Sequence, residues 1–245
     1  PAAFAGRMNR QWWDAAAGDL RKVDPAGSIL VSAARPKLIV DMIKASRRRR
    51  ENVHFIPLLH DFMPLHAWAT KRFRKFDRNF LADNRYVIEN SSLILTNSAF
   101  TRQELERFSA EGMLPPAREA VAVPLVQYCA AGNEVPSFQL PAEPYLLTVG
   151  SNLGRKNIEV VFRALGVLSE RGARVPRLVV AGAARHRLSR FLQRPDMASI
   201  REKVIFAVNP HQADLVRLYE NALALVIPSR IEGWGLPAGE ALWCG

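Results

Sequence analysis

The sequence predicts an α/β protein with two doubly wound, Rossmann-like domains that face each other across a cleft. Short apolar runs alternate with stretches of helical periodicity, a pattern typical of βαβ units with parallel sheets. A Pro-rich stretch without periodicity, at 132–144, separates two sets of this alternation. The chain has 245 residues, 49% of them hydrophobic, which is enough for two modest domains with buried cores.

The expected organisation is an N-terminal domain at 1–135, a linker at 136–144 and a C-terminal domain at 145–245. Each domain is expected to hold a parallel sheet covered on both faces. The chain starts without an initiator Met and stops within its last pattern. We therefore expect both domains to be truncated, the first at its start and the second at its end.

Four apolar runs in the N-terminal half are expected to be strands, at 28–33, 53–59, 92–96 and 121–125. The helices between them are expected to start at Pro36, near residue 69 and near Thr101. Proline suits the first position of a helix. Thr101 and Glu104 form a capping box, which predicts a third helix from Thr101 to Phe108.

The C-terminal half repeats the alternation. Its expected strands lie at 145–149, 177–181, 204–207 and 223–227, and its expected helices at 157–171, 188–193 and 213–221. A last helix is expected to begin at Pro237. Ligands of open parallel sheets bind beyond the carboxyl ends of the strands, so the residues that follow each strand are the candidates for function.

The formal net charge is +11, from 34 Lys and Arg against 23 Asp and Glu. The densest basic runs are at 47–50 and 71–76. Such runs attract nucleic acid, an anionic membrane or nucleotide phosphates, and the alternative is a solvated helix face. No helix-turn-helix, zinc-finger or RNP-type pattern occurs, so no nucleic-acid partner is expected.

Two further observations concern the compartment. No apolar stretch reaches the ~18 residues of a membrane-spanning helix. Cys129 and Cys244 lie far apart in the sequence, which excludes a disulfide framework and a Cys-based zinc site and fits a reducing compartment. The expected location is cytoplasmic.

The first candidate site follows the strand at 145–149. Gly150 and Gly154 let a backbone approach closely, and Arg155 and Lys156 stand at the start of the next helix. Free N–H groups at a helix N-terminus and two cations together form a cradle for a diphosphate. The alternative is a simple turn with solvated charges.

The second candidate site is the loop and helix start at 228–240. Its glycines leave backbone N–H groups open to a ligand. Glu232 in the loop and Glu240 on the helix can accept hydrogen bonds from sugar hydroxyls at opposite ends of a bound molecule. The alternative is a capping carboxylate and an exposed glutamate.

The string EGWGLPAGEALWCG closely resembles the E-x7-E signature of retaining GT-B glycosyltransferases of the large family four. The segments TVGSNLGRKN, VIFAVNPHQADLVRLYENA, LLHDFMPL and LILTNSAFTRQEL resemble further motifs of this family, in its order and spacing. The resemblance covers roughly residues 53–245. Bacterial mannosyltransferases and related enzymes of surface-polysaccharide assembly are the most similar. The sequence departs from the family at Pro124 to Val126, where an Asn-Gly or Gly-Val-Asp step is usual, and shows no glycine-rich donor loop.

The resemblance implies a role for each candidate residue. Arg155 and Lys156 would hold the donor diphosphate, Glu232 the donor sugar and Glu240 the ribose hydroxyls. Other residues would line the site: Gly150 at the phosphate turn, Val208 and Asn209 at the base, the backbone of Trp234, Gly235 and Leu236 at sugar and phosphate, and His60 at the cleft from the other domain. Glu232, His60, Arg155 and Lys156 would be the catalytic set.

The implied reaction moves a sugar such as mannose from a GDP- or UDP-linked donor to a glycan or lipid-linked acceptor, with retention. It needs no metal and no cofactor besides the nucleotide sugar, because cations and a helix dipole stabilise the leaving group. Two alternatives stay open: a nucleotide-sugar epimerase of related fold, and a non-catalytic, basic nucleic-acid-binding or scaffold fragment.

The helix expected at 69–90 also predicts a peripheral contact with an anionic membrane surface, because aromatic and basic side chains alternate in it. These side chains are Trp68, Phe73, Phe76 and Phe80, with Lys71, Arg72, Arg74, Lys75, Arg78 and Arg85. The alternative is that the phenylalanines pack on the N-terminal sheet and the cations are solvated.

Overall fold

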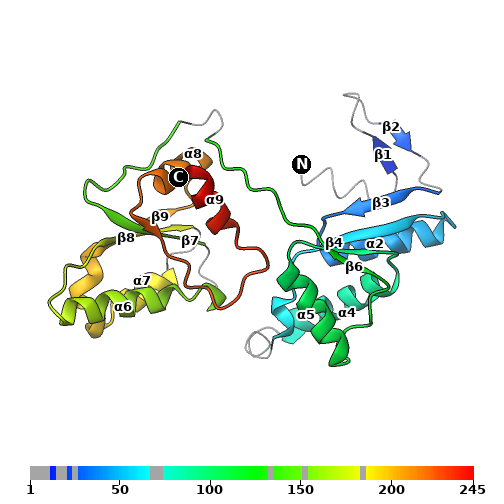
Figure 1. Ribbon diagram of the computed structural model, residues 1–245, viewed down its shortest axis with the longest axis horizontal. Helices are drawn as coiled ribbons and strands as arrows, with labels where there is room; N and C mark the ends of the chain where they lie inside the picture. Colours follow the sequence, from blue (N-terminus) through cyan, green and yellow to red (C-terminus); the bar gives the residue numbers. More distant parts are fainter. Residues whose placement is uncertain are drawn as a thin grey trace. The chain divides into compact units, whose positions relative to one another are not determined.

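The computed structural model describes residues 12–14, 21–23, 27–66, 74–131, 135–150, 154–182 and 186–245, with the side chains of 27–66 and of 78 onward within these ranges. The chain forms two compact units, Pro1–Leu125 and Val126–Gly245 (Figure 1). Each contains a four-stranded parallel sheet with helices, so the α/β class and the parallel sheets are confirmed.

The sheet of the N-terminal unit has the order β3-β4-β5-β6. Its strands are β3 (Ile29–Ser32), β4 (His54–Leu59), β5 (Ile94–Thr96) and β6 (Ala120–Ala122), all parallel. Its helices are α2 (Pro36–Arg48), α4 (Arg74–Glu89) and α5 (Ala99–Ala110), with a 3₁₀ turn η1 (Met63–Leu65). A short antiparallel pair, β1 (Trp12–Asp14) and β2 (Arg21–Val23), was not expected from the sequence.

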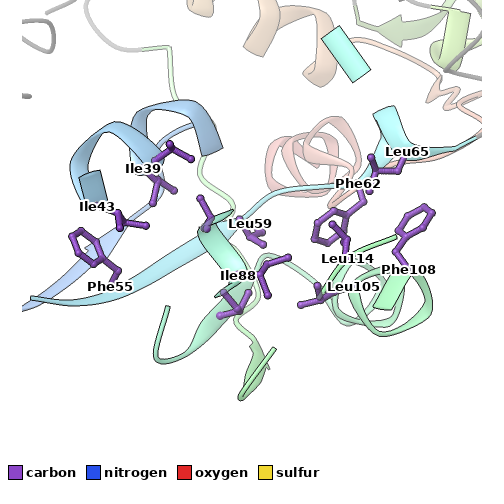
Figure 2. Close-up of a cluster of buried hydrophobic side chains, with 13 residues drawn as sticks. Ile39, Ile43, Phe55, Leu59, Phe62, Leu65, Ile88, Leu105, Phe108 and Leu114 are labelled. Carbon is purple, nitrogen blue, oxygen red and sulfur yellow. The ribbon is translucent and has the colours of Figure 1, made fainter. Parts of the chain in front are cut away.

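One hydrophobic cluster holds the N-terminal unit together (Figure 2). Ile39 and Ile43 come from α2 at the four-residue spacing that places both on one face of a helix. They share the cluster with Phe55 of β4, Ile88 of α4 and Leu105 of α5. Complete burial of an aliphatic or aromatic side chain of this size stabilises the fold by about 1.5–3 kcal/mol.

The start of α5 corrects the expected capping box. The helix begins at Ala99, and the Ser98 hydroxyl accepts a hydrogen bond from the Thr101 N–H at 3.0 Å. Ser98 is extended, as an N-cap residue must be, so Thr101 lies at the third helical position. Glu104 therefore does not cap the helix start and instead binds His66 and Arg107.

The C-terminal unit has the sheet order β10-β7-β8-β9. Its strands are β7 (Tyr145–Val149), β8 (Arg177–Gly182), β9 (Val204–Val208) and β10 (Ala224–Leu225). Its helices are α6 (Ile158–Glu170), α7 (His186–Leu192), α8 (Gln212–Glu220) and α9 (Leu236–Cys244), with 3₁₀ segments η2 (Gly154–Lys156) and η3 (Pro195–Lys203). The strand expected at 223–227 is shorter than predicted.

Alternate residues of β8 pack on opposite faces of this sheet. Leu178 and Val180 belong to a cluster with side chains of α6 and α7, and Val179 and Ala181 to a cluster with side chains of α8. In Figure 1, α6 and α7 accordingly lie on one side of the sheet and α8 and α9 on the other. A strand covered on both faces must be apolar throughout, which explains the uninterrupted run LVVA.

The division between the units lies ahead of the linker expected at 136–144. Cys129, which the sequence analysis assigned to the N-terminal domain, is buried in a cluster of the C-terminal unit. Ser137 and Phe138 both donate backbone N–H groups to the buried carboxylate of Asp214, each at 2.7 Å. These contacts attach the residues after Leu125 to α8. No helix in the described part of the chain is long and apolar enough to span a membrane.

Candidate functional site

Three segments meet at the carboxyl edge of the C-terminal sheet, where the sequence predicted a site. Gly150 directly follows β7, Val208 ends β9, and the loop that contains Glu232 follows β10. Neighbouring parallel strands end at the same edge, so residues far apart in the sequence are brought together there.

The centre of this edge is an ion-pair cluster of Glu232 with Arg155 and Lys156. Lys156 Nζ lies 2.6 Å and Arg155 Nη1 2.9 Å from the two carboxylate oxygens of Glu232. The Lys156 side chain is only 10% exposed. With all three groups charged, the cluster keeps one net positive charge, which an anion can share.

The backbone around the cluster fixes the loop to the start of α6. The Arg230 N–H donates to the Arg155 carbonyl at 2.8 Å, and the Asn157 side-chain amide donates to the Pro228 carbonyl at 3.2 Å. Asn157 has φ 51°, a left-handed conformation that asparagine tolerates better than most residues. These two hydrogen bonds fix the turn that carries Arg155 and Lys156 to the loop that carries Glu232.

The pKa of Glu232 is lowered from its ordinary value. Partial burial alone would raise it, but the hydrogen bond from Lys156 and the charges of Lys156 and Arg155 outweigh burial. Glu232 is therefore a carboxylate at neutral pH, able to accept hydrogen bonds and unable to donate one.

Gly150 is needed for the close approach of Lys156. Its φ is +151°, and a Cβ atom there would lie 3.0 Å from Lys156 Cε. A Cβ atom on Gly182, at the end of β8, would collide with the Gly150 carbonyl. The ends of β7 and β8 thus approach each other through two glycines, as the expected phosphate turn requires of Gly150.

Val208 and Asn209 lie at the same edge, at the end of β9. Val208 is paired with Gly182, and the Asn209 N–H donates to the Gly182 carbonyl at 3.0 Å. Both side chains are exposed. The expected role of their backbone, to face the base of the donor, stays a prediction.

The start of α9 carries the rest of the expected set. Gly235, with φ 84°, precedes the first helical residue, and Leu236 is 49% exposed. Trp234 is half-buried. Glu240 accepts a hydrogen bond from the Tyr219 hydroxyl of α8 at 2.7 Å. Burial, and then the bond to Glu240, raise the pKa of Tyr219, so it stays a donor.

The sequence analysis missed Tyr219 and the anchoring role of Asn157. Tyr219 stands in the quoted segment VIFAVNPHQADLVRLYENA, but its contact with Glu240 depends on how α8 and α9 pack. Asn157 stands in the quoted Arg-Lys-Asn string, but a side-chain bond to Pro228 requires the loop to return to that point.

His60 lies in the N-terminal unit, directly after β4. Its Nε2 is 2.9 Å from the Ala33 carbonyl, which can only accept a hydrogen bond. The proton of a neutral His60 ring is therefore on Nε2, and Nδ1 is left as the acceptor. The expected position of His60 at a cleft stays a prediction.

A second cluster in the N-terminal unit was not foreseen. The Glu104 carboxylate binds the His66 ring and also pairs with Arg107 Nε at 3.0 Å. The Arg107 guanidinium lies 4.0 Å from the centre of the Phe108 ring. Among the described residues, no three His, Cys, Asp or Glu side chains are placed together to hold a metal ion.

Comparison with known proteins identifies the C-terminal unit. Residues 134–245 match the family described as glycosyl transferases group 1. This range contains every predicted site residue except His60. Residues 134–245 are thus similar to the glycosyl transferases group 1 family.

The curated relatives and solved structures agree with this assignment. The serotype-specific mannosyltransferase WbdA of Escherichia coli is 28% identical over 198 residues, which cover 76% of this chain and 24% of the relative. The chain thus spans about a quarter of the length of the relatives it matches. Sucrose-phosphate synthase from Thermosynechococcus elongatus superposes with a TM-score of 0.64 at 20% identity, over 89% of this chain and 54% of that one.

A further similar structure is WaaG, a glycosyltransferase involved in lipopolysaccharide biosynthesis. Its TM-score is 0.59 at 17% identity, over 89% of this chain and 65% of that one. The motifs at 145–245 resemble those of GT-B glycosyltransferases of family four. Together these matches confirm that resemblance. They do not favour the epimerase or the nucleic-acid-binding fragment.

Proposed function

We propose that the protein transfers a sugar from a nucleoside diphosphate donor to a hydroxyl of a glycan or lipid-linked acceptor, with retention and without a metal ion. The observation that carries this proposal is the cluster of Arg155, Lys156 and Glu232 at the carboxyl edge of the sheet. It lies within the residues that match the group 1 family and keeps one net positive charge beside an anchored turn.

The proposed role of the cations is to stabilise the leaving diphosphate. As the bond between the anomeric carbon and the donor phosphate oxygen breaks, negative charge grows on that oxygen. Preorganised cations lower the energy of such a transition state without reorganising solvent. The acceptor oxygen then bonds to the anomeric carbon from the same face, and its proton passes to the departing phosphate.

The proposed role of Glu232 follows from its charge state. Because it stays ionised, it can accept hydrogen bonds from hydroxyls of the donor sugar while it orients Lys156. Glu240, held by Tyr219, would accept from the ribose hydroxyls. The backbone at Gly150, Trp234, Gly235, Leu236, Val208 and Asn209 would line the phosphate, sugar and base.

The donor and acceptor are also proposals. The similarity to the mannosyltransferase WbdA supports mannose as the transferred sugar, and we propose GDP or UDP as its carrier. His60, with Nδ1 as an acceptor, would receive a hydrogen bond from the sugar or the acceptor hydroxyl. Incubating the protein with a panel of GDP- and UDP-sugars, with and without glycan acceptors, tests this. Release of nucleoside diphosphate is expected with at least one donor, and its absence with every donor would contradict the proposal.

A reversible contact with an anionic membrane surface, on the cytoplasmic side, is proposed for the helix expected at 69–90. Residues 67–73 lie outside the described residues, as do the side chains of 74–77. Phe80 packs against the core of the N-terminal unit, whereas Arg78 and Arg85 are exposed. Co-sedimentation with anionic vesicles should exceed that with neutral vesicles and fall with salt. Binding that ignores lipid charge and salt would exclude this contact.

A further inference from the structure

The two cysteines of the sequence, far apart along the chain, come together in the C-terminal unit. Cys129 is 4% exposed and belongs to the cluster that covers one face of the sheet. Cys244, the last residue of α9, is half-buried and packs against the same cluster. Neither is disulfide-bonded. Separation in the sequence therefore did not mean separation in the fold.

Contacts on both sides of the pair hold the segment with Cys129 against α9. The rings of Tyr128 and Trp243, the residues that precede the two cysteines, meet edge to face with centroids 5.4 Å apart. Within the first half of the helix, a Cβ atom on Gly239 would collide with the Gln127 side chain, so the segment and the helix are in close contact there too. These contacts hold the two cysteines in the same part of the C-terminal unit.

The two sulfurs differ in access. Burial is the main cause that raises the pKa of Cys129 to about 12, and a hydrogen bond with the Cys244 thiol adds to it. Gln212 donates a further hydrogen bond to Cys129 Sγ at 3.4 Å. At neutral pH Cys129 is a buried thiol, so a reagent from solvent reaches Cys244 first.

We propose that Cys129 and Cys244 form a reversible disulfide when the protein meets a small-molecule disulfide such as oxidised glutathione. The Cys244 thiolate attacks one glutathione sulfur and expels the other half as a thiolate. The expelled glutathione thiolate takes the proton of the Cys129 thiol, and the Cys129 sulfur attacks Cys244 in this mixed disulfide and expels the second glutathione thiolate. Two protein thiols are oxidised, and one glutathione disulfide is reduced to two thiols.

This bond would tie the end of α9 to the segment that leads into the C-terminal sheet. Both side chains belong to or pack against one cluster, so a disulfide joins residues that are already neighbours in the fold. The cross-link closes a loop that contains nearly all of residues 134–245. Such a bond restricts the unfolded chain, so the oxidised C-terminal unit should melt on the order of 5–10 °C higher than the reduced one.

The test equilibrates the full protein with a series of oxidised and reduced glutathione ratios, then alkylates free thiols and measures intact mass. At oxidising ratios the protein should carry no alkyl group and no glutathione, and a peptide pair joined through Cys129 and Cys244 should appear. Reduction should restore two alkylation sites and lower the melting temperature. Cys244→Ser is the matched control. In this variant Cys129 has no second thiol to bond with, so the melting temperature of the variant should not respond to glutathione.

Three results would overturn the proposal: two thiols that alkylate at every ratio, a stable glutathione adduct on Cys244, or a disulfide that joins two chains. The wild-type protein alone decides between these results. The test therefore remains decisive even if the Cys244→Ser variant fails to fold. Its result also does not depend on the proposed transfer reaction.

Discussion

The carboxyl edges of the two sheets use their polar side chains differently. In the N-terminal unit, three of these side chains bind backbone groups: His60 donates to the Ala33 carbonyl, the Asp61 carboxylate accepts from the Met63 N–H, and Ser98 caps α5. In the C-terminal unit, Arg155 and Lys156 bind Glu232, from a loop far along the chain.

The difference separates groups that stabilise a fold from groups that can hold a ligand. A side chain that caps a helix or turn satisfies one backbone group and contributes about 0.5–2 kcal/mol to stability. Burying charges costs desolvation energy that the attraction between them often does not offset. A gain in stability from ion pairing therefore does not explain why two cations and one carboxylate lie at this edge. Substitutions at the two edges should therefore act on different quantities, stability in the first and ligand affinity or turnover in the second.

Lys156→Ala should have the largest effect. Loss of one preorganised donor at a developing negative charge lowers turnover by about 10²–10³-fold. Arg187→Ala is the matched control: Arg187 forms an exposed ion pair with Glu159 rather than with Glu232, and its loss should leave turnover unchanged. Steady-state release of nucleoside diphosphate measures both. Turnover of Lys156→Ala within about twofold of the wild type would remove Lys156 from the site.

Glu232→Gln and Glu240→Gln should separate the roles of the two carboxylates. Glu232→Gln should mainly lower kcat, by roughly 10–100-fold, whereas Glu240→Gln should mainly raise KM for the donor. Glu232→Gln also removes the negative charge beside Lys156, so binding of free nucleoside diphosphate should hold or tighten. Equal changes of kcat and KM in both variants would mean that the carboxylates have no separate roles.

Asp214→Asn should act on stability. Asp214 accepts three hydrogen bonds from Ser137 and Phe138, and its loss should lower the free energy of unfolding by about 1–3 kcal/mol. Burial alone would raise the pKa of Asp214, but these bonds lower it below its ordinary 3.8. A lowered pKa stabilises the fold above the ordinary value, and this contribution is lost as the pH falls through the folded pKa.

Urea unfolding of the two proteins between pH 7 and pH 3 checks this prediction. The difference in unfolding free energy should be full at pH 7 and should shrink below about pH 4. Asp196→Asn, at an exposed pair with Arg194, is the control and should change stability by less than about 0.5 kcal/mol. A difference that grows as the pH falls would contradict the role of Asp214.

Ser98→Ala should have the smallest effect and should sharpen the contrast between the two edges. Loss of the N-cap bond to Thr101 should cost about 1 kcal/mol of stability. The affinity for nucleoside diphosphate should not change. Thermal unfolding and a nucleotide titration on the same sample measure both. A change in affinity would show that the N-terminal edge also holds the donor.

The fold was predictable because both sheets are parallel and buried. Short apolar runs that alternate with helical patterns, such as LVVA in β8, are typical of strands covered on both faces. Helix starts were less predictable, since Ser98 and Thr101 are both good caps and only the backbone of Ser98 is extended. The strand expected at 223–227 is regular only at Ala224–Leu225, and Leu223 and Val226 on either side each donate one backbone hydrogen bond to β7. An apolar run does not show how many of its residues pair in a sheet.

The position of the candidate site at the sheet edge could be predicted from the sequence, whereas the contacts between its side chains could not. Strand order explains why Gly150, Val208 and the loop with Glu232 share one edge. The sequence assigned the cations to phosphate and Glu232 to sugar, and gave no sign that the three bind one another. The contacts of Cys129 with Cys244 and of Tyr219 with Glu240 depend on how α9 packs, and no local pattern encodes that packing.

The central claim is that the edge with Arg155 and Lys156 binds a nucleoside diphosphate. Calorimetric titration of the protein with GDP and UDP, beside the matching nucleosides, tests it most directly. We expect saturable, millimolar or tighter binding of at least one diphosphate and weaker binding of its nucleoside. This difference should be lost in Lys156→Ala but not in Arg187→Ala. Equal affinity for diphosphate and nucleoside, or a Lys156→Ala variant that binds like the wild type, would contradict it.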